Sequence, residues 1–283
     1  MWTDRVSVTE PIVSERMDQL VSVIIPTLNE EESLPTTLSA LDSQTYDKLE
    51  VMVIDSGSND RTQTIALEHD AKVVFYPGRP MGARWKGFEE SRGSFILFLD
   101  GDQVLYPDSI ERAVRAMSGH DMLVLEETSY RPRGYLQRSI CRQKTSTHAA
   151  ADPKRGVGPN LYPRFYRREV LQKAYQGLDE AAMARVFAYD DALLFRRTYE
   201  VSKRLVILHK GVMHIEEGDW YQLMRHSLKT GMSARSLDIS RLQGDIGREE
   251  SQWVKMQRAI KGRYFLMSLV KELFFRFGYR KMR

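Results

Sequence analysis

Residues 94–102 have the sequence SFILFLDGD, an apolar run that ends in two carboxylates. Similar runs occur at 21–26 (VSVIIP), 50–55 (EVMVID), 72–76 (KVVFY) and 121–126 (DMLVLE). Short aliphatic runs bounded by polar residues are typical of strands that are buried on both faces. We therefore expect each of these runs to form a strand of one sheet.

Helices are expected between the strands. One should begin near Ser33, with a buried stripe formed by Leu34, Leu38 and Leu41. Asp60, followed three residues later by Gln63, is typical of a capping box and predicts a helix that runs toward Asp70. A third helix should follow the loop PGRPMG and stop at Gly93. The alternation predicts an α/β fold, a Rossmann-like and mostly parallel sheet flanked by helices.

The composition favours a globular protein of a reducing compartment. The sequence lacks an apolar stretch of about eighteen residues, and its N-terminus is charged rather than built as a signal peptide. The single cysteine, Cys141, cannot form an internal disulfide. We expect a cytoplasmic protein.

Two carboxylates stand at the end of the strand within 94–102. Ligands of an open parallel sheet bind beyond the carboxyl ends of its strands. Asp100 and Asp102 would form a hard-oxygen site there, suited to Mg²⁺ or Mn²⁺ bridging to a diphosphate. A simple Asp-Gly turn is the alternative, but acids clustered after a buried strand repel one another unless a cation or hydrogen bonds compensate.

Two other strand ends carry candidate nucleoside-binding groups. Asp55 ends its strand too early to cap the next helix, which leaves its carboxylate available to the N–H of a base. Asn29 and Glu30 follow the first strand. They could begin a helix or contact a ribose, and both alternatives remain open.

Three motifs resemble, in order and spacing, the nucleotide-binding motifs of family-two glycosyltransferases. They are PTLNEEESL from Pro26, VIDSGSNDRT from Val53, and GARWKGFEESRGSFILFLDGD from Gly82. The likeness is strong from Val21 to Val104, weaker to about residue 235, and absent beyond. It implies the GT-A fold, inversion at the anomeric carbon, and a DxD pair that holds a divalent metal on the diphosphate of a sugar nucleotide.

The resemblance also implies roles for individual residues. Arg84 would lie near the nucleoside site, Asp100 would serve the diphosphate, and Asp100 and Asp102 would bind Mn²⁺ or Mg²⁺. The residues that would line the nucleoside site are Pro26, Thr27, Glu30 and Asp55.

A general base and a third metal ligand are predicted further along the chain. YDDALLFRR resembles the Glu-Asp pair of the family and places Asp191 at the base position, with Asp190 where Glu is usual. An Asp-Asp pair would also suit a helix N-terminus. His214 stands where some relatives complete the metal shell, although a lone histidine is more often structural.

The charge is uneven along the chain. Residues 255–283 carry nine Lys or Arg and one acid, so the remainder has a net charge of −4. A helix from about Lys261 would place Leu266, Met267, Val270, Leu273, Phe274 and Phe277 on one side. That pattern is typical of an amphipathic helix on an anionic membrane surface, and a helix docked on the core is the alternative.

These observations define the expected organisation. Residues 1–20 would form an N-terminal arm and 21–235 a GT-A domain, divided into a nucleotide-binding half (21–126) and an acceptor half (127–235). Residues 236–283 would form a basic, amphipathic helical tail. Basic residues confined to one terminus argue against nucleic acid as a partner.

The predicted function is inverting, metal-dependent transfer of a sugar from a UDP- or GDP-linked donor to a hydroxyl of a lipid-linked or cell-surface glycan. The enzyme would work as a peripheral protein at the cytoplasmic face of the cell membrane. One alternative is a polyprenyl-phosphate glycosyltransferase, whose acceptor needs no base. Another is an inactive sugar-nucleotide-binding partner in a membrane complex.

Overall fold

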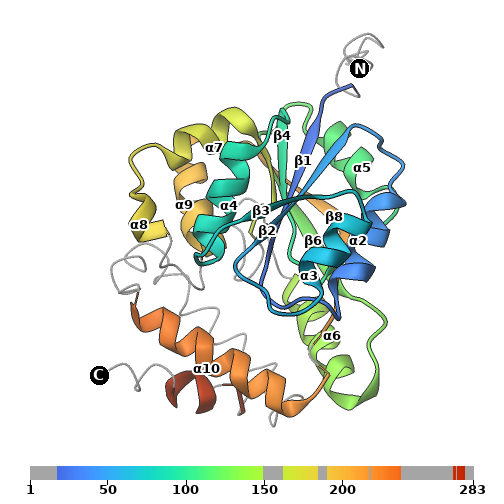
Figure 1. Cartoon of the computed structure of the whole chain (residues 1–283), viewed down its shortest axis with the longest axis vertical. Coiled ribbons are helices and arrows are strands. Elements are labelled where there is room, and N and C mark those ends of the chain that lie inside the picture. Colours follow the sequence, from blue (N-terminus) through green and yellow to red (C-terminus); the bar gives the residue numbers. More distant parts are fainter. Residues whose placement is uncertain are drawn as a thin grey trace, which may run out of the picture.

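The computed structural model describes residues 18–148, 162–183, 190–216, 218–236, 270–271 and 273–277. Within these ranges the chain folds around one eight-stranded sheet with helices on both faces (Figure 1). The expected α/β architecture is confirmed. The described part of the chain contains no helix that is both long and apolar enough to cross a membrane.

The strand order is β3-β2-β1-β4-β7-β6-β8-β5. The neighbours β3, β2, β1 and β4 are parallel, as expected for the first half of the chain. The second half is mixed, because β7 pairs antiparallel with β4 and β6 whereas β6 and β8 are parallel. The strands are β1 Val21–Thr27, β2 Leu49–Asp55, β3 Lys72–Phe75, β4 Phe95–Phe98, β5 Gln103–Leu105, β6 Met122–Ser129, β7 Phe165–Arg167 and β8 Leu205–His214.

Alternate side chains of the strands pack into two cores. Val23 of β1 faces the core shared with α2, α3 and α5, whereas Ile24 faces the core shared with α4, α7 and α9. Gly87 lets α4 approach the sheet closely, since a Cβ there would lie 2.4 Å from Ile24 Cγ2. The helices are α2 Leu34–Asp42, α3 Thr62–Glu68, α4 Pro80–Glu90, α5 Ser109–Ala116, α6 Gly134–His148, α7 Arg168–Tyr175, α8 Glu180–Met183, α9 Asp190–Val201 and α10 Trp220–Ser236.

Two helix ends differ from the sequence-based expectation. Helix α3 begins at Thr62 with Arg61 as its N-cap, so the expected capping box from Asp60 to Gln63 is wrong. Asp60 Oδ1 accepts from the Thr62 N–H at 3.0 Å, and Gln63 Nε2 turns away to donate to Asp55 at 2.7 Å. Helix α4 ends at Glu90 rather than at Gly93, because Ser91 is already extended.

Helices α6 and α10, together with residues 270–271 and 273–277, lie outside the two cores and are called the satellite. They share a third, smaller apolar cluster. Leu136 and Ile140 of α6 pack with Leu223 of α10, and Trp220 and Val270 lie against them. In Figure 1, α6, α10 and the short C-terminal helix gather at one end of the molecule, beyond the sheet. The satellite is therefore held together by its own small core.

The predicted domain division remains a prediction, and residue 126 falls inside β6. Of the predicted N-terminal arm, residues 1–17 lie outside the described residues. Of the predicted tail, Ser236 ends α10, and beyond it only 270–271 and 273–277 are described, in helical conformation.

The buried carboxylate of Asp121 links β6, β7 and β8, close to the first residues of β6 and β8. Asp121 precedes β6 and accepts from Ser202 Oγ at 2.7 Å and from Arg204 Nη2 at 2.7 Å. The Nε of Arg167, at the end of β7, lies 3.2 Å from Asp121 Oδ1. Burial alone would raise the pKa of Asp121, but these hydrogen bonds and the arginine charges outweigh it and lower the pKa.

Replacing this carboxylate should destabilise the fold in a pH-dependent way. The pKa of folded Asp121 lies below its ordinary value of 3.8, so its contribution is present above that value and is lost as the pH falls through the folded pKa. We expect Asp121→Asn to lower the free energy of unfolding by about 1–3 kcal/mol at pH 7. Urea midpoints at pH 7 and in acid, beside the exposed control Asp47→Asn, measure this. If the difference in urea midpoint between wild type and Asp121→Asn were as large in acid as at pH 7, this prediction would be contradicted.

Candidate active site

The carboxyl ends of β1, β2 and β4 meet at one rim of the sheet. In the parallel register, Thr27 lies beside Asp55, and the Leu99 N–H donates to the Ile24 carbonyl at 3.1 Å, which brings the end of β4 to the same edge. Asp100 and Asp102 follow directly. The rim predicted from the strand ends is thus formed.

The DGD turn is held by side chains from two other elements. The Asp100 N–H donates to Gln103 Oε1 at 3.0 Å, and Thr37 Oγ1 of α2 donates to the Gly101 carbonyl at 2.9 Å. A Cβ on Gly101 would lie 3.1 Å from Cγ of Glu30, so glycine allows that close approach. The turn is therefore fixed with its two carboxylates at the rim.

Strand register brings His214 to this turn. β5 pairs antiparallel with β8, so Gln103 lies opposite His214, and the Ile215 N–H donates to the Asp102 carbonyl at 2.8 Å. His214 Nε2 then lies 3.3 Å from Asp102 Oδ2. Burial opposes protonation of His214, but its interactions with the carboxylates of Asp102 and Glu216, which accept from the protonated ring, outweigh burial and raise the pKa of His214 well above its ordinary value.

Arg84 connects the two halves of the site. It projects from α4, its side chain is only 4% exposed, and it donates to Asp100 Oδ1 at 2.7 Å. Its Nη1 also pairs with Asp190 and lies 2.9 Å from Asp191 Oδ1, both in the first turn of α9. The structure thus brings the predicted base and the first DxD carboxylate onto one buried guanidinium.

Arg164 is a site residue that the sequence reasoning missed. Its Nη1 lies 2.9 Å from Asp100 Oδ2, and its Nη2 donates to Asp191 Oδ2 at 3.3 Å. It reaches this position because β7 runs antiparallel to β4, and the Phe98 N–H donates to the Arg164 carbonyl at 2.9 Å. A three-residue strand in an irregular stretch leaves no periodic signal that could have located it.

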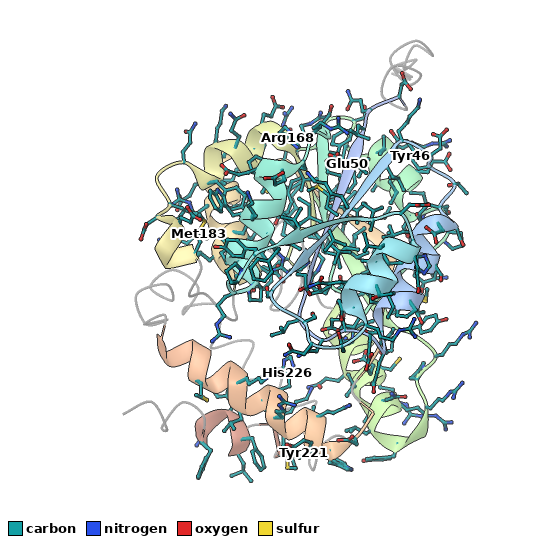
Figure 2. The ribbon with its side chains drawn as sticks, viewed as in Figure 1. Tyr46, Glu50, Arg168, Met183, Tyr221 and His226 are labelled. Atoms are coloured by element: carbon teal, nitrogen blue, oxygen red, sulfur yellow. The ribbon has the colours of Figure 1, made fainter. Side chains whose placement is uncertain are left out.

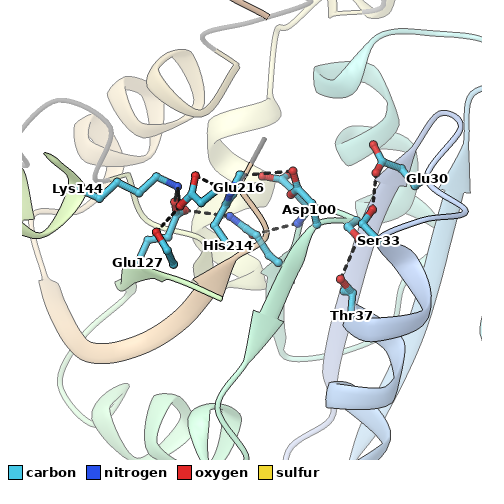
Figure 3. A network of polar contacts seen from close by, with 12 residues as sticks. Glu30, Ser33, Thr37, Asp100, Glu127, Lys144, His214 and Glu216 are labelled. Carbon is cyan, nitrogen blue, oxygen red and sulfur yellow. Dashed lines mark hydrogen bonds and ion pairs between the residues drawn. The ribbon is translucent and has the colours of Figure 1, made fainter. Parts of the chain in front are cut away.

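A second charged network continues from His214 toward α6 (Figure 3). Glu216 Oε2 lies 3.4 Å from His214 Nδ1, and its other oxygen lies 2.9 Å from Lys144 Nζ. Lys144 also pairs with Glu127 at 2.5 Å, and Ser129 Oγ donates to Glu216 at 2.5 Å. Glu216 therefore orients His214 while Lys144, from α6, compensates its charge.

Acids outnumber bases in this part of the described chain. With His214 protonated, six carboxylates face four cationic groups, an excess of two negative charges. The acids are Asp100, Asp102, Glu127, Asp190, Asp191 and Glu216, and the bases are Arg84, Lys144, Arg164 and His214. Buried charge of one sign is costly, so a divalent cation would be favoured here.

The predicted ligands fit a metal that is shared with a substrate. Asp102 Oδ1 is buried without a hydrogen-bond partner, which leaves an acceptor atom beside His214, whereas Asp100 is engaged by two arginines. In the described ranges, no three His, Cys, Asp or Glu side chains are grouped to hold a metal by themselves. Mg²⁺ and Mn²⁺ sites typically combine one or two carboxylates with substrate phosphates, and this donor set suits such a site.

Asp55 organises the loop that follows β2. Its carboxylate accepts from the N–H groups of Gly57 and Ser58 at 3.1 and 3.0 Å and from Gln63 Nε2 at 2.7 Å. Burial would raise the pKa of Asp55, but these hydrogen bonds outweigh it and lower the pKa. Asp55 is thus a buried anion within its own loop, and its predicted contact with a base stays a prediction.

Glu30 has the opposite character. Burial and the neighbouring carboxylates raise its pKa to about 7, although Ser33 Oγ donates to it at 2.7 Å. Near neutral pH a carboxyl group with this pKa exists in both forms, so it can accept or donate a hydrogen bond. That property suits contact with hydroxyl groups such as those of a ribose.

The sequence and fold were compared with known proteins. The profile of the family "Glycosyl transferase family 2" matches residues 22–175. Among curated proteins, the undecaprenyl-phosphate 4-deoxy-4-formamido-L-arabinose transferase of Pseudomonas aeruginosa is 38% identical over 170 residues, 54% of this chain and 48% of that protein. Glycosyltransferase AglE of Haloferax volcanii is 41% identical over 108 residues, 35% of this chain and 36% of AglE.

Solved structures resemble the fold over most of the chain. Glucosyl-3-phosphoglycerate synthase of Mycobacterium tuberculosis, in complex with Mn²⁺, UDP and glucosyl-3-phosphoglycerate, superposes with a TM-score of 0.56 at 19% identity, covering 85% of this chain and 86% of that one. TarS 1-349 of S. aureus with UDP gives a TM-score of 0.56 at 19% identity, over 83% and 78%. These neighbours confirm the GT-A fold.

The chain spans about a third to a half of the length of the curated relatives it matches. The family profile nevertheless covers more than half of this chain, including β1 to β4, the DGD turn and Arg164. The protein therefore belongs to glycosyltransferase family 2.

Proposed function

We propose that this protein transfers a sugar from a nucleoside diphosphate donor to an acceptor, with inversion at the anomeric carbon. The observation that carries the proposal is the meeting of Arg84, Asp100, Asp102, Asp191 and His214 at one rim of a GT-A sheet. The TarS and synthase structures contain UDP, which supports a UDP-linked donor, and a GDP-linked donor is the alternative.

The two buried arginines would bind the donor diphosphate. In this structure Arg84 and Arg164 share Asp100 and Asp191. A diphosphate, like a carboxylate, accepts two charge-assisted hydrogen bonds from a guanidinium fork, and it carries more negative charge than a single carboxylate. The diphosphate would therefore take over the arginines and release Asp100, so that nucleotide and metal bind together.

Asp102, the released Asp100 and His214 would hold Mn²⁺ or Mg²⁺, with the Nε2 proton of His214 lost to solvent as the metal binds. When bound there, the cation would supply charge stabilisation to the departing diphosphate. Glu216 keeps His214 turned toward Asp102, and Arg84 would offset the remaining negative charge. Pro26, Thr27, Glu30 and Asp55 are proposed to line the nucleoside site.

Asp191 is proposed as the general base. It lies in the first turn of α9, where the two arginines fix both of its oxygens. Taking a proton from an acceptor hydroxyl becomes possible when the diphosphate draws the arginines away. The oxygen of the acceptor would then attack the anomeric carbon from the side opposite the leaving group.

A phosphate acceptor is a second candidate, supported by a specific observation. Two guanidinium groups contact Asp191, and if only one of them turned to the donor diphosphate, the other would remain beside Asp191 to meet an anionic acceptor. An ionised phosphate needs no base, and the P. aeruginosa relative is named for an undecaprenyl-phosphate acceptor. Either acceptor could be linked to a membrane lipid, which agrees with a peripheral protein at the cytoplasmic membrane face.

Nucleotide and metal should bind cooperatively. In calorimetric titrations we expect UDP or GDP to bind in the presence of Mn²⁺ and to bind much more weakly with a chelator. Asp102→Asn should lose the metal dependence, whereas the exposed carboxylate variant Asp108→Asn should behave like wild type. The absence of binding of either nucleotide under all conditions would contradict the proposed function.

Arg164 should contribute to donor affinity. A lost hydrogen bond between charged groups typically costs about 1.5–3 kcal/mol, so we expect Arg164→Gln to weaken UDP binding by about tenfold or more. Arg164→Lys keeps the charge without the fork and should be intermediate. The exposed control Arg196→Gln should have wild-type affinity. Unchanged affinity in Arg164→Gln would refute the role of this arginine.

Asp191→Asn distinguishes the two acceptor classes. With a hydroxyl acceptor, loss of the base should reduce turnover by about 10²- to 10⁴-fold while UDP binding in the presence of Mn²⁺ persists. With a phosphate acceptor, most of the turnover should survive. Rates with each acceptor and calorimetry on the same preparation measure both properties. Full turnover on a hydroxyl acceptor would refute the assignment of the base, and donor binding by wild type without any transfer would support the inactive alternative.

A further inference from the structure

The two long helices of the satellite contain no acidic residue. α6 has 15 residues and α10 has 17, in a chain with 38 Asp and Glu. Exposed basic residues on these two helices include Arg138 and Arg225. Arg131 and Arg133, just before α6, are exposed as well. The exposed face of the satellite therefore carries these four arginines, and its two long helices contribute no carboxylate to it.

Large apolar side chains are exposed on the same elements. Tyr135 is 66% exposed and Tyr221 is 67% exposed, each near the start of its helix. On the C-terminal helix, Leu273 and Phe277 are 56% and 62% exposed. Figure 2 shows Tyr221 and His226 on α10, at the end of the molecule away from the sheet. Aromatic rings among basic residues are typical of protein surfaces that lie at a membrane interface.

The satellite is connected to the active site by an ion-pair network. Lys144 of α6 contacts Glu127 and Glu216, and Gln137 Nε2 of the same helix donates to the Glu216 carbonyl at 3.0 Å. Glu216 in turn contacts His214. A surface bound through α6 would therefore be held at a fixed position relative to the rim where sugar transfer is proposed.

We infer that the exposed face of the satellite, formed by α6, α10 and residues 270–271 and 273–277, binds the surface of an anionic lipid bilayer. The headgroups would be met by Arg131, Arg133, Arg138 and Arg225, and the interfacial region would be entered by Tyr135, Tyr221, Leu273 and Phe277. The inference deepens the proposed function and rests on it in one respect, since a lipid-linked acceptor would reach the rim from this side. The described helices would lie on the bilayer rather than cross it.

Vesicle co-sedimentation of the full chain tests the inference. We expect binding to vesicles that contain phosphatidylglycerol and little binding to phosphatidylcholine alone, with weakening as salt is added. Tyr135→Ser combined with Tyr221→Ser should weaken binding by about tenfold, as should Arg138→Glu combined with Arg225→Glu. The matched controls are Leu67→Ser with Val201→Ser and Arg115→Glu with Arg196→Glu, exposed positions on other helices.

UDP binding, measured on each sample, separates this inference from the proposed function. If the wild-type protein binds UDP but not anionic vesicles, the inferred lipid binding is overturned and the proposed function is not. If it binds vesicles but not UDP, only the proposed function is overturned. Satellite variants that retain UDP binding are folded, so equal vesicle binding by these variants and by their controls would overturn the inference. Binding to duplex DNA in place of vesicles, with the same dependence on the variants, would overturn it too.

Discussion

A buried guanidinium group holds the site together. Arg84 belongs to α4, in the first half of the chain, yet its partners are Asp100 after β4 and the two acids that begin α9. Burying an arginine is costly, and three carboxylates offset that cost only if β4, α4 and α9 are correctly packed. The position of Asp191, the proposed base, therefore depends on Arg84 from the predicted nucleotide-binding half. Helix α9 alone would not fix it.

The same arrangement explains how six acidic side chains can lie close together in one site. Arg84 and Arg164 compensate Asp100 and Asp191, while protonated His214 and Lys144 compensate Asp102, Glu127 and Glu216. The remaining excess of negative charge is compatible with a divalent cation, and a diphosphate would bring negative charge for the arginines. Donor and metal would thus replace internal ion pairs, which reduces the cost of desolvating each group.

The features that could be predicted from the sequence are those that depend on local residue patterns. Apolar runs located β1 to β4 and β6, and carboxylates at strand ends located the rim, because parallel neighbours end at one edge. The role of Gln63 was predicted wrongly, because sequence alone does not show whether its side chain caps a helix or donates a hydrogen bond to Asp55. Arg164 could not be located, since its place depends on the antiparallel pairing of a three-residue strand. His214 was predicted as a metal ligand from family resemblance alone, and that role stays a prediction; the β5–β8 register supplies the physical reason for its position beside Asp102.

Lys144 gives the satellite a second role besides presenting a surface. A lysine buried between Glu127 and Glu216 cannot move away without leaving both acids uncompensated next to His214. Any force on α6, including attachment to a lipid surface, therefore acts on the group that orients His214 toward Asp102. In this geometry, α6, which is proposed to approach the lipid surface, is coupled to the proposed donor site through the Lys144 ammonium group and through the hydrogen bond from Gln137 to the Glu216 carbonyl.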